Sequence, residues 1–343
     1  MAHSLADAEL EELATGLISA ALTERLAGAE LSKHKLLFEA VRRHAATESA
    51  QAVRLLGEIE REHPRVVAQL LALPQVGVWA VECLHQLRLG GAGEWGYLER
   101  LAASGAFRAG RSVPDMQLPG LGTIACQRLT ALPRISAGNL SVILDDEDPY
   151  FRIFGERERP NIERWQAGLG AAWELLDRLD TPSTQAMAAG VTTLVPLRAG
   201  RFVSATSAWA WGAIAMSAPD DPVRVAEALV HEFHHLALNA ADDITRLTRP
   251  GDTTLWRPPW RADPRPLLAT FQGCYAFTAV AGFWRDVLRA GPPEQAGRAR
   301  AQFERWSAGT LATADAIADT PGLTSAGRHI LYGVRTRLRT WIQ

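Results

Sequence analysis

Lysine is nearly absent from this chain. Lys33 and Lys35 are the only two, and all the other basic residues among its 36 are arginines. A single arginine is therefore a weak indicator of function in this sequence. Acidic residues number 38, so the formal charge at pH 7 is only −2. A chain without a positive balance lacks the electrostatic footprint of a polyanion-binding protein, and we expect no nucleic-acid partner.

Cysteine is also scarce. Cys83, Cys126 and Cys274 lie far apart and are odd in number, which excludes a disulfide framework or a cysteine metal cluster. The first residues, MAHSLADAELEELATGL, carry acids where a signal peptide needs a basic region followed by an apolar one. The longest uncharged run, 266–284, contains one glutamine, two threonines and two glycines, so we expect a buried segment and no membrane partner. These features predict a cytoplasmic protein.

The pattern of apolar residues predicts an α+β fold that is mainly helical. Residues 4 to about 105 show apolar positions at helical spacing. Short strands are expected at 120–126 and 139–146, a polar turn at 145–152, a helix at 162–180, and β-like runs at 190–198 and 202–218. A helix from Pro222 to about Ala241, a long helix at 267–290 and two further helices complete the chain.

These elements suggest two regions. Residues 1–135 form a helical N-terminal region, and residues 136–343 form a metal-binding catalytic region, unless the two make one compact unit. The strands predict a small mixed sheet beside the metal-binding helix, in an arrangement like that of zincin peptidases.

The stretch EALVHEFHHLALNA contains the pattern His-Glu-x-x-His, with His231, Glu232 and His235 in its three places. Histidines four residues apart on a helix are separated by about 40° around the axis and roughly 6 Å along it, so both imidazoles reach one ion. The motif lies on a predicted helix capped by Asp221. The alternative is a helix with surface histidines. His234 points about 60° away from His231, which predicts a supporting or a solvated side chain.

The third ligand decides the chemistry. In metzincin peptidases the motif continues to a glycine and a third histidine, but here the continuation is LALNAAD. The helix at 267–290, where a gluzincin would place its glutamate, has no glutamate, and its only acid is Asp286 near the end. Asp242 shares a face with His235 but lies about 10 Å along the helix. The hydrolytic interpretation therefore lacks an obvious partner for the two histidines.

A non-haem iron site is the other chemistry that fits, because two histidines and an oxygen ligand leave positions for dioxygen and a co-substrate. A 2-oxo acid co-substrate needs a cation for its distal carboxylate, and arginine provides a bidentate one. The segment LWRPPWRADPRP offers Arg257, Arg261 and Arg265 just after the metal helix. The alternative is a rigid proline loop with tryptophans stacked on guanidinium groups.

Two blocks, LVHEFHHLALNAADDI at 229–244 and PPWRADPRPLLATFQGCYAFTAVAGFWRDVL at 258–288, carry a resemblance. They resemble the HExxH-motif proteins associated with ribosomally synthesised, post-translationally modified peptides, which are described as 2-oxoglutarate-dependent iron peptide β-hydroxylases. That family shows a HEFxH helix followed by LNA, then PWRxDPRP, then xGxYAFxxVAxFWR. The chain has each element in this order.

The resemblance implies a set of roles. Iron would be held by His231 and His235, with Gln272 as third ligand where many members have histidine; if not Gln272, then an acid such as Asp242 or Asp263. Glu232 would orient a bound ligand. For 2-oxoglutarate, Arg261 and Arg265 are the expected anchors, and Tyr275 either hydrogen-bonds in the pocket or is a packed helix residue.

The β-like run before the metal helix has a further implication. In zincin-like layouts such a strand borders the cleft, and an extended peptide adds to its edge, here near Ser207 and Trp209. The alternative is an ordinary strand whose tryptophans are core residues.

Three functions follow from these observations. The first is an Fe(II)- and 2-oxoglutarate-dependent β-hydroxylase that uses dioxygen to modify a side chain of a precursor peptide. The second is a zinc metallopeptidase in which Glu232 is the general base. The third is a non-catalytic peptide-binding accessory protein with a structural or vestigial metal site.

Overall fold

The N-terminal part of the chain is helical, as expected. The structure, a computed structural model, describes residues 4–45, 49–111, 132–179, 183–198 and 200–343. Its first elements are α1 (Asp7–Thr15), α2 (Ala20–His44), α3 (Ala50–Glu62), α4 (Pro64–Leu71), α5 (Pro74–Arg88) and α6 (Trp95–Arg108). In α3 the buried residues are Ala52, Leu56 and Ile59, which recur at helical spacing and give the helix one apolar face. The packing of such faces forms a helical lobe.

A five-stranded mixed sheet follows, with the order β1-β2-β3-β5-β4. Its strands are β1 (Arg134–Ala137), β2 (Leu140–Leu144), β3 (Thr193–Leu197), β4 (Ser204–Ala205) and β5 (Ala213–Ser217). The central pairs β2–β3 and β3–β5 are parallel, whereas the outer pairs β1–β2 and β4–β5 are antiparallel. The expected α+β class with a small mixed sheet is confirmed.

One expected strand differs from the structure, and another cannot be compared with it. The run at 202–218 is not one strand: it divides into the edge strand β4 and the inner strand β5, joined by a turn in which Ala210 N–H donates to the carbonyl of Ser207. Gly212 has φ 85° at the start of β5, a conformation that favours glycine and reverses the chain there. The strand expected at 120–126 lies outside the described residues.

The sheet joins two hydrophobic cores. In β3 Leu194 packs in the core of the C-terminal half, whereas Val195 packs in the core of the helical lobe. Neighbouring β5 alternates in the same way between Ile214 and Ala215. Successive side chains of a strand point to opposite faces, so the two regions cover opposite faces of these strands. The expected boundary between residues 135 and 136 falls within β1.

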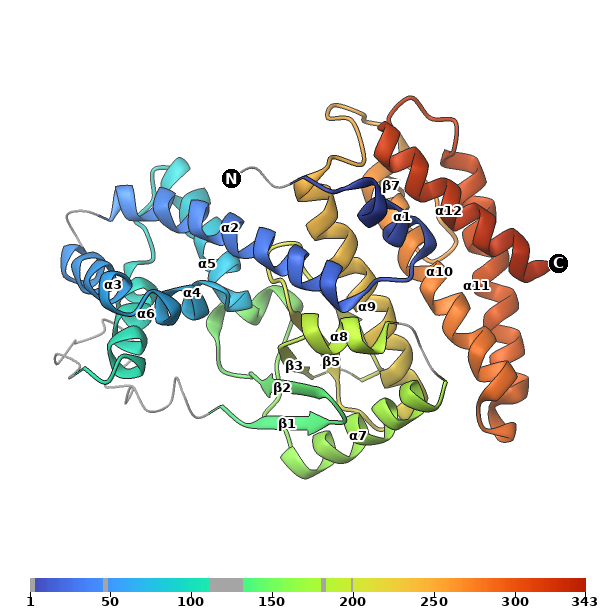
Figure 1. Cartoon of the computed structure of the whole chain (residues 1–343), viewed down its shortest axis with the longest axis horizontal. Coiled ribbons are helices and arrows are strands. Elements are labelled where there is room, and N and C mark those ends of the chain that lie inside the picture. Colours follow the sequence, from blue (N-terminus) through green and yellow to red (C-terminus); the bar gives the residue numbers. More distant parts are fainter. Residues whose placement is uncertain (1–3, 46–48, 112–131, 180–182, 199) are drawn as a thin grey trace.

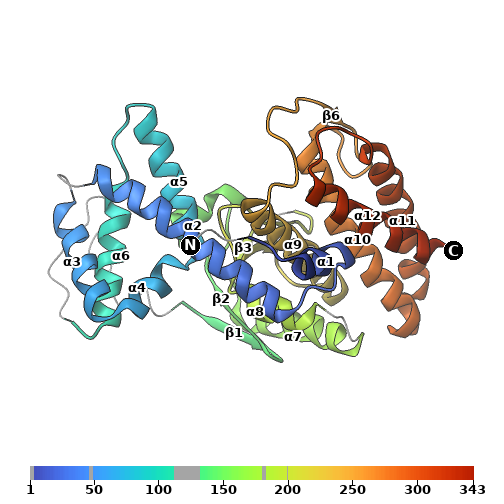
Figure 2. The ribbon, with the colours of Figure 1, turned by 45° about the horizontal axis from the view of Figure 1, so that its top comes forward.

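The C-terminal half is mostly helical. Its elements are η2 (Pro149–Phe154), α7 (Ile162–Arg178), α8 (Thr184–Gly190), α9 (Pro222–Ile244), the ribbon β6 (Leu255–Trp256) and β7 (Arg265–Pro266), α10 (Leu267–Ala290), η3 (Pro293–Gln295), α11 (Ala296–Ile317) and α12 (Ser325–Ile342). Figures 1 and 2 show α3–α6 at one end, α10–α12 at the other, and α2 running from the first group toward α9. The helix α9, which carries the His-Glu-x-x-His motif, lies between the sheet and α10.

One described helix, α10, is long and apolar enough to cross a membrane, and α4 and α5 pass the same test together only as a pair bent by 73°. In the most apolar window of α10, however, 67% is buried inside the molecule. The helix packs against α9 and α11, as the sequence suggests for a buried segment.

Candidate metal centre

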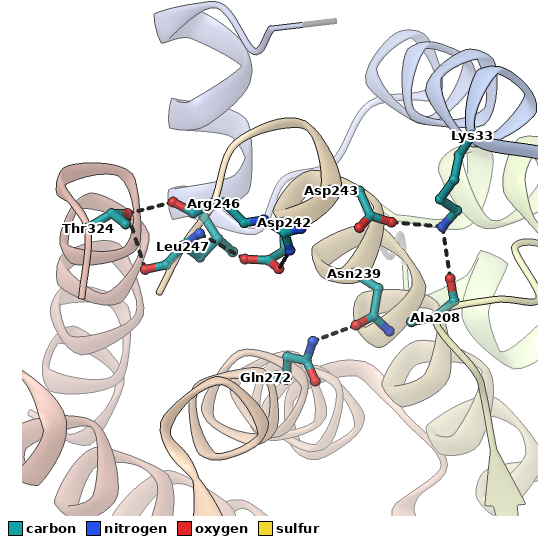
Figure 3. A network of polar contacts seen from close by, with 9 residues as sticks. All are labelled: Lys33, Ala208, Asn239, Asp242, Asp243, Arg246, Leu247, Gln272 and Thr324. Atoms are coloured by element: carbon teal, nitrogen blue, oxygen red, sulfur yellow. Dashed lines mark hydrogen bonds and ion pairs between the residues drawn. The ribbon is translucent and has the colours of Figure 1, made fainter. Parts of the chain in front are cut away.

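Acidic side chains accept backbone hydrogen bonds at both ends of the motif helix α9. Asp221 accepts hydrogen bonds from the N–H groups of Val223 and Arg224, with proline at the first helical position, as expected. The helix runs to Ile244, three residues beyond the expected end. Asp242, buried near that end, accepts from Leu247 N at 2.8 Å and from Arg246 (Figure 3). It therefore terminates the helix.

His231 and His235 lie side by side on this helix, with ring centroids 4.7 Å apart. Both are half-buried. Burial lowers the pKa of His235 to about 4, and the charge of His234 lowers it further. Burial likewise lowers the pKa of His231, with His235 as the next cause. Both imidazoles are therefore neutral at pH 7, which is the form that binds a metal ion.

The two histidines line a cavity of about 560 Å³. Its walls come from four places: the edge strand and the turn after it, the face of α9, the segment that leads into α10, and α10 itself. The predicted residues that line it are His231, Glu232, His235, Arg261, Arg265 and Gln272. Residues far apart in the sequence thus meet in one hollow.

Glu232 is buried at the side of this cavity, with only 4% of its surface exposed. Ser204 Oγ, on β4, donates to Glu232 Oε1 at 2.7 Å, and the hydroxyl of Thr206 is a further hydrogen-bond partner. Burial raises the pKa of Glu232 to about 7, and both hydroxyl groups oppose that rise. Glu232 thus ties the metal helix to the edge strand.

Gln272 reaches the cavity from α10 and meets Asn239 of α9. Its Nε2 donates to Asn239 Oδ1 at 2.5 Å (Figure 3). Asn239 was missed as a site residue in the sequence, although it stands four residues after His235 and therefore on the same face. The four-residue spacing from His235 and the LNA element are the features of the sequence that could have identified Asn239.

The arginines of the proline-rich segment differ in their surroundings. Arg265 forms an ion pair with Asp263 at 3.1 Å. Within the described ranges, Arg261 has no ion pair, and its charge contributes to the lowered pKa of His235. Arg257 is exposed and does not line the cavity. Asp263 thus pairs with Arg265 and not with the histidines. Of the two arginines that line the cavity, Arg261 is the one without an ion pair among the described residues.

Aromatic side chains that the sequence did not single out form one wall. Phe277 lies 4.7 Å from His231, 4.8 Å from Trp260 and 4.2 Å from Trp306, measured between ring centroids, and it is stacked on Trp306. Gly273 lets Trp260 approach α10, because a Cβ there would come within 2.7 Å of the indole. The tryptophan of the PWR element therefore packs on Phe277 and not on a guanidinium group.

Some predicted residues lie elsewhere. Tyr275 does not line the cavity; it is buried against His234, with ring centroids 5.7 Å apart, because the cavity-facing stripe of α10 consists of Ala269, Gln272, Gly273 and Phe277. His234 is itself buried, with Nδ1 2.7 Å from the carbonyl oxygen of Val230, so it is not solvated.

Ser207 and Trp209 lie in the turn after β4. The residues on either side of Ser207, Thr206 and Ala208, line the cavity, whereas Ser207 and Trp209 stand just outside it. Trp209 is 42% exposed, so it is not the core residue that an ordinary inner strand would have. Its ring lies under Lys33, whose Nζ is 5.3 Å from the ring centroid.

The residues that the structure describes contain no group of three or more His, Cys, Asp or Glu side chains arranged to hold a metal ion. Any ion at His231 and His235 would therefore need a different third donor, and the side-chain amides that line the same cavity are Gln272 and Asn239. Compared with known protein families and with curated proteins, the chain shows no significant match.

Proposed function

We propose that this chain is an Fe(II)- and 2-oxoglutarate-dependent hydroxylase that modifies the β-carbon of a side chain in a ribosomally made precursor peptide. The observation that supports it is the convergence in one cavity of two neutral imidazoles, an amide and two arginines beside an edge strand. The arginines fit this proposal because a 2-oxo acid needs a cation near its metal for the distal carboxylate.

The donor set fits an iron ion held by two histidines. His231 and His235 would be the imidazole ligands, and the amide oxygen of Gln272 would be a neutral third donor, oriented by the hydrogen bond from its Nε2 to Asn239. A neutral amide is a weaker ligand than a carboxylate or an imidazole, so the protein would hold iron loosely. When bound, iron supplies oxidation by dioxygen: 2-oxoglutarate becomes succinate and carbon dioxide, and the second oxygen atom becomes the product hydroxyl group.

Arg261 is the better anchor for the 2-oxoglutarate carboxylate, because Arg265 is already paired with Asp263. A planar guanidinium pairs with a carboxylate through two parallel hydrogen bonds, which fixes the co-substrate in the cavity. The apolar wall at Phe277 and Trp260 would exclude water from the reacting end.

The peptide substrate would bind along β4. This strand is at the edge of the sheet, so its outer backbone groups are free to pair with an extended peptide, in the zincin-like manner that the motif helix suggests. Ala205 of β4 lines the cavity, so a peptide paired there would pass directly over the histidines. Ser207 and Trp209 would contact it at the rim.

A zinc metallopeptidase is the second candidate. One observation favours it: Glu232 faces the cavity with a pKa of about 7, which suits a general base. Against it stands the commitment of that carboxyl group to Ser204 and the lack, in the described ranges, of a third His, Asp or Glu beside the two histidines. An accessory protein that binds a peptide without chemistry would share the edge strand but would not need Arg261.

The deciding experiment is an anaerobic titration of metal-free protein with Fe(II) and then with 2-oxoglutarate, followed by absorption spectroscopy. We expect a visible charge-transfer band only when both are present, and its loss in His235→Ala. Tight zinc binding with cleavage of a peptide bond would overturn the proposal in favour of the peptidase. Retention of in vivo peptide modification in His231→Ala would favour the accessory protein.

A further inference from the structure

A second cavity lies in the helical lobe, against the sheet. It has a volume of about 120 Å³ and shares no lining residue with the metal cavity. One side is the face of α6 that carries Arg100, Ser104 and Arg108, and the opposite side is the segment after β2 that carries Asp145 and Asp148. Leu70 and Leu101 provide apolar surface.

Arg100 is the unusual residue of this cavity. Only 9% of its surface is exposed. Its Nε and Nη1 atoms are buried and have no hydrogen-bond partner anywhere in the described part of the chain. The ring of Tyr97, 5.6 Å from Cζ, is the contact that faces its charge. Burying guanidinium donors without hydrogen-bond partners is costly, so their retention needs a reason.

Burial raises the pKa of Asp148, and the charge of Arg100 across the cavity lowers it. No hydrogen bond joins the two side chains among the described residues, however, and other donors of the chain already bind both acids. Asp145 Oδ1 accepts from the N–H groups of Glu147 and Asp148 at 3.0 and 2.9 Å. Asp148 accepts from Tyr150 N at 3.0 Å and from the Tyr97 hydroxyl at 3.1 Å. The buried donors without a partner on this side of the cavity are Nε and Nη1 of Arg100.

Arg108 adds a second positive group to the same side. It stands two turns after Arg100 on α6, with Ser104 between them, so the three share one face. Arg108 is exposed at its end of the helix, and partial burial lowers the pKa of its guanidinium. Two guanidinium groups on one wall of the cavity provide paired donors for a ligand that brings negative charge.

We propose that this cavity binds a carboxylate on a short apolar stem, with the carboxylate on Arg100 and Arg108 and the stem against Leu70 and Leu101. A water molecule needs about 10–15 Å³ of such space, so the volume admits about ten heavy atoms, the size of a small free acid or one acidic side chain of a peptide. A phosphate is less favourable than a carboxylate, because Asp145, Glu147 and Asp148 in the same lining repel a dianion more strongly than a single negative charge. The site is independent of the iron chemistry proposed above.

Isothermal titration of the full chain tests this site. The probes are glutarate, L-glutamate, and two short peptides that differ only by Glu or Gln at one position. Arg261→Met serves as background, so that binding in the metal cavity does not contribute. We expect L-glutamate and the peptide that carries Glu to bind. Binding of the Glu peptide without the free acids would support the site and identify a peptide as its source.

Arg100→Met is the decisive variant. A ligand-binding role predicts that affinity falls at least about tenfold while the melting temperature without ligand is unchanged or higher, since Nε and Nη1 lose no hydrogen bond and their burial cost is removed. A purely structural role of Arg100 predicts instead that the melting temperature falls while the affinity for the probes is retained. Arg111→Met, just beyond the same helix and paired with Glu58 and Glu62, is the matched control and should bind normally.

If Arg100→Met does not fold, Arg108→Met provides the same test and should show the same loss. The proposal is overturned if wild-type protein binds none of the probes, or if binding persists in both arginine variants.

Discussion

Lys33 of α2 and Asp243 of α9 form an ion pair across 210 positions of sequence, with Nζ 2.7 Å from Oδ2 (Figure 3). The same ammonium group donates to the carbonyl oxygen of Ala208 at 3.0 Å and lies over the ring of Trp209. Ala208 lines the cavity of His231 and His235. One of the two lysines of the chain thus links the turn at the rim of that cavity to the C-terminal end of α9.

This contact predicts a positioning role for Lys33. Lys33→Met should raise the KM for the peptide several-fold, because the turn loses its attachment, while kcat and the Fe(II)–2-oxoglutarate band change little. Lys35→Met is the matched control: it is two residues away on the same helix, exposed, and has no ion pair among the described residues. Equal effects of both variants on KM would contradict the prediction.

Trp209 gives a more direct test of the edge strand. Its exposed ring stands beside the turn, so Trp209→Ala should weaken peptide binding by roughly 1–2 kcal/mol if the peptide passes over it. Ser207→Ala should cost less, because the Ser207 hydroxyl already accepts from Trp209 N at 3.2 Å. Fluorescence anisotropy with a labelled peptide measures both. Unchanged affinity in the two variants would exclude this rim as a contact surface.

Glu30, beside Lys33, makes stability depend on pH. Burial raises the pKa of Glu30 to about 7, against the opposing effect of Lys33. Protonated Glu30 is therefore favoured in the folded state, and its contribution to stability is present below pH 4.5 and lost as the pH rises through 7. The shift corresponds to roughly 3 kcal/mol at most.

Glu30→Gln removes this dependence. Its free energy of unfolding relative to wild type should increase between pH 5 and pH 8, as measured by urea denaturation at several pH values. Glu39→Gln, on the exposed face of the same helix, is the control. The Arg42 side chain lowers the pKa of Glu39, so that variant should show a small change of opposite sign.

Gln272 offers a test of the metal site itself. In Gln272→His an imidazole replaces a neutral amide, and its second ring nitrogen can donate to Asn239, as metal-bound histidines commonly require. We expect Fe(II) affinity to rise roughly tenfold, measured by anaerobic competition with a chelator. Gln166→His, on α7, is the control. An unchanged affinity would place the third ligand elsewhere.

Local features of the sequence predicted the metal helix well. Asp221 and Pro222 specify its start through contacts within three residues, and the four-residue spacing of His231 and His235 fixes their shared face. Such features depend on helix geometry alone. The end of the helix was misplaced because Asp242 acts on residues of the following turn, which periodicity does not reveal.

Features that depend on packing were harder to predict. Phe277 and Trp260 reach the cavity only because α10 docks on α9, with Trp284 donating to Glu227 at 2.8 Å. Tyr275 shares their helix, yet it faces His234. Periodicity shows which residues share a face, but which face meets the histidines follows from how the two helices pack.

Glu232 distinguishes the two enzymatic proposals. Its carboxyl oxygen accepts from Ser204, and Glu232→Gln retains an oxygen for that hydrogen bond. A hydroxylase that uses Glu232 only to orient ligands should keep its charge-transfer band and lose less than about tenfold in kcat. Removing the general base of a peptidase removes a contribution of about 10²–10⁴. Mass spectrometry of the peptide gives the readout, because hydroxylation adds one oxygen atom and hydrolysis yields two fragments. A loss beyond a hundredfold, with fragments formed by the wild type, would establish Glu232 as the base of a peptidase.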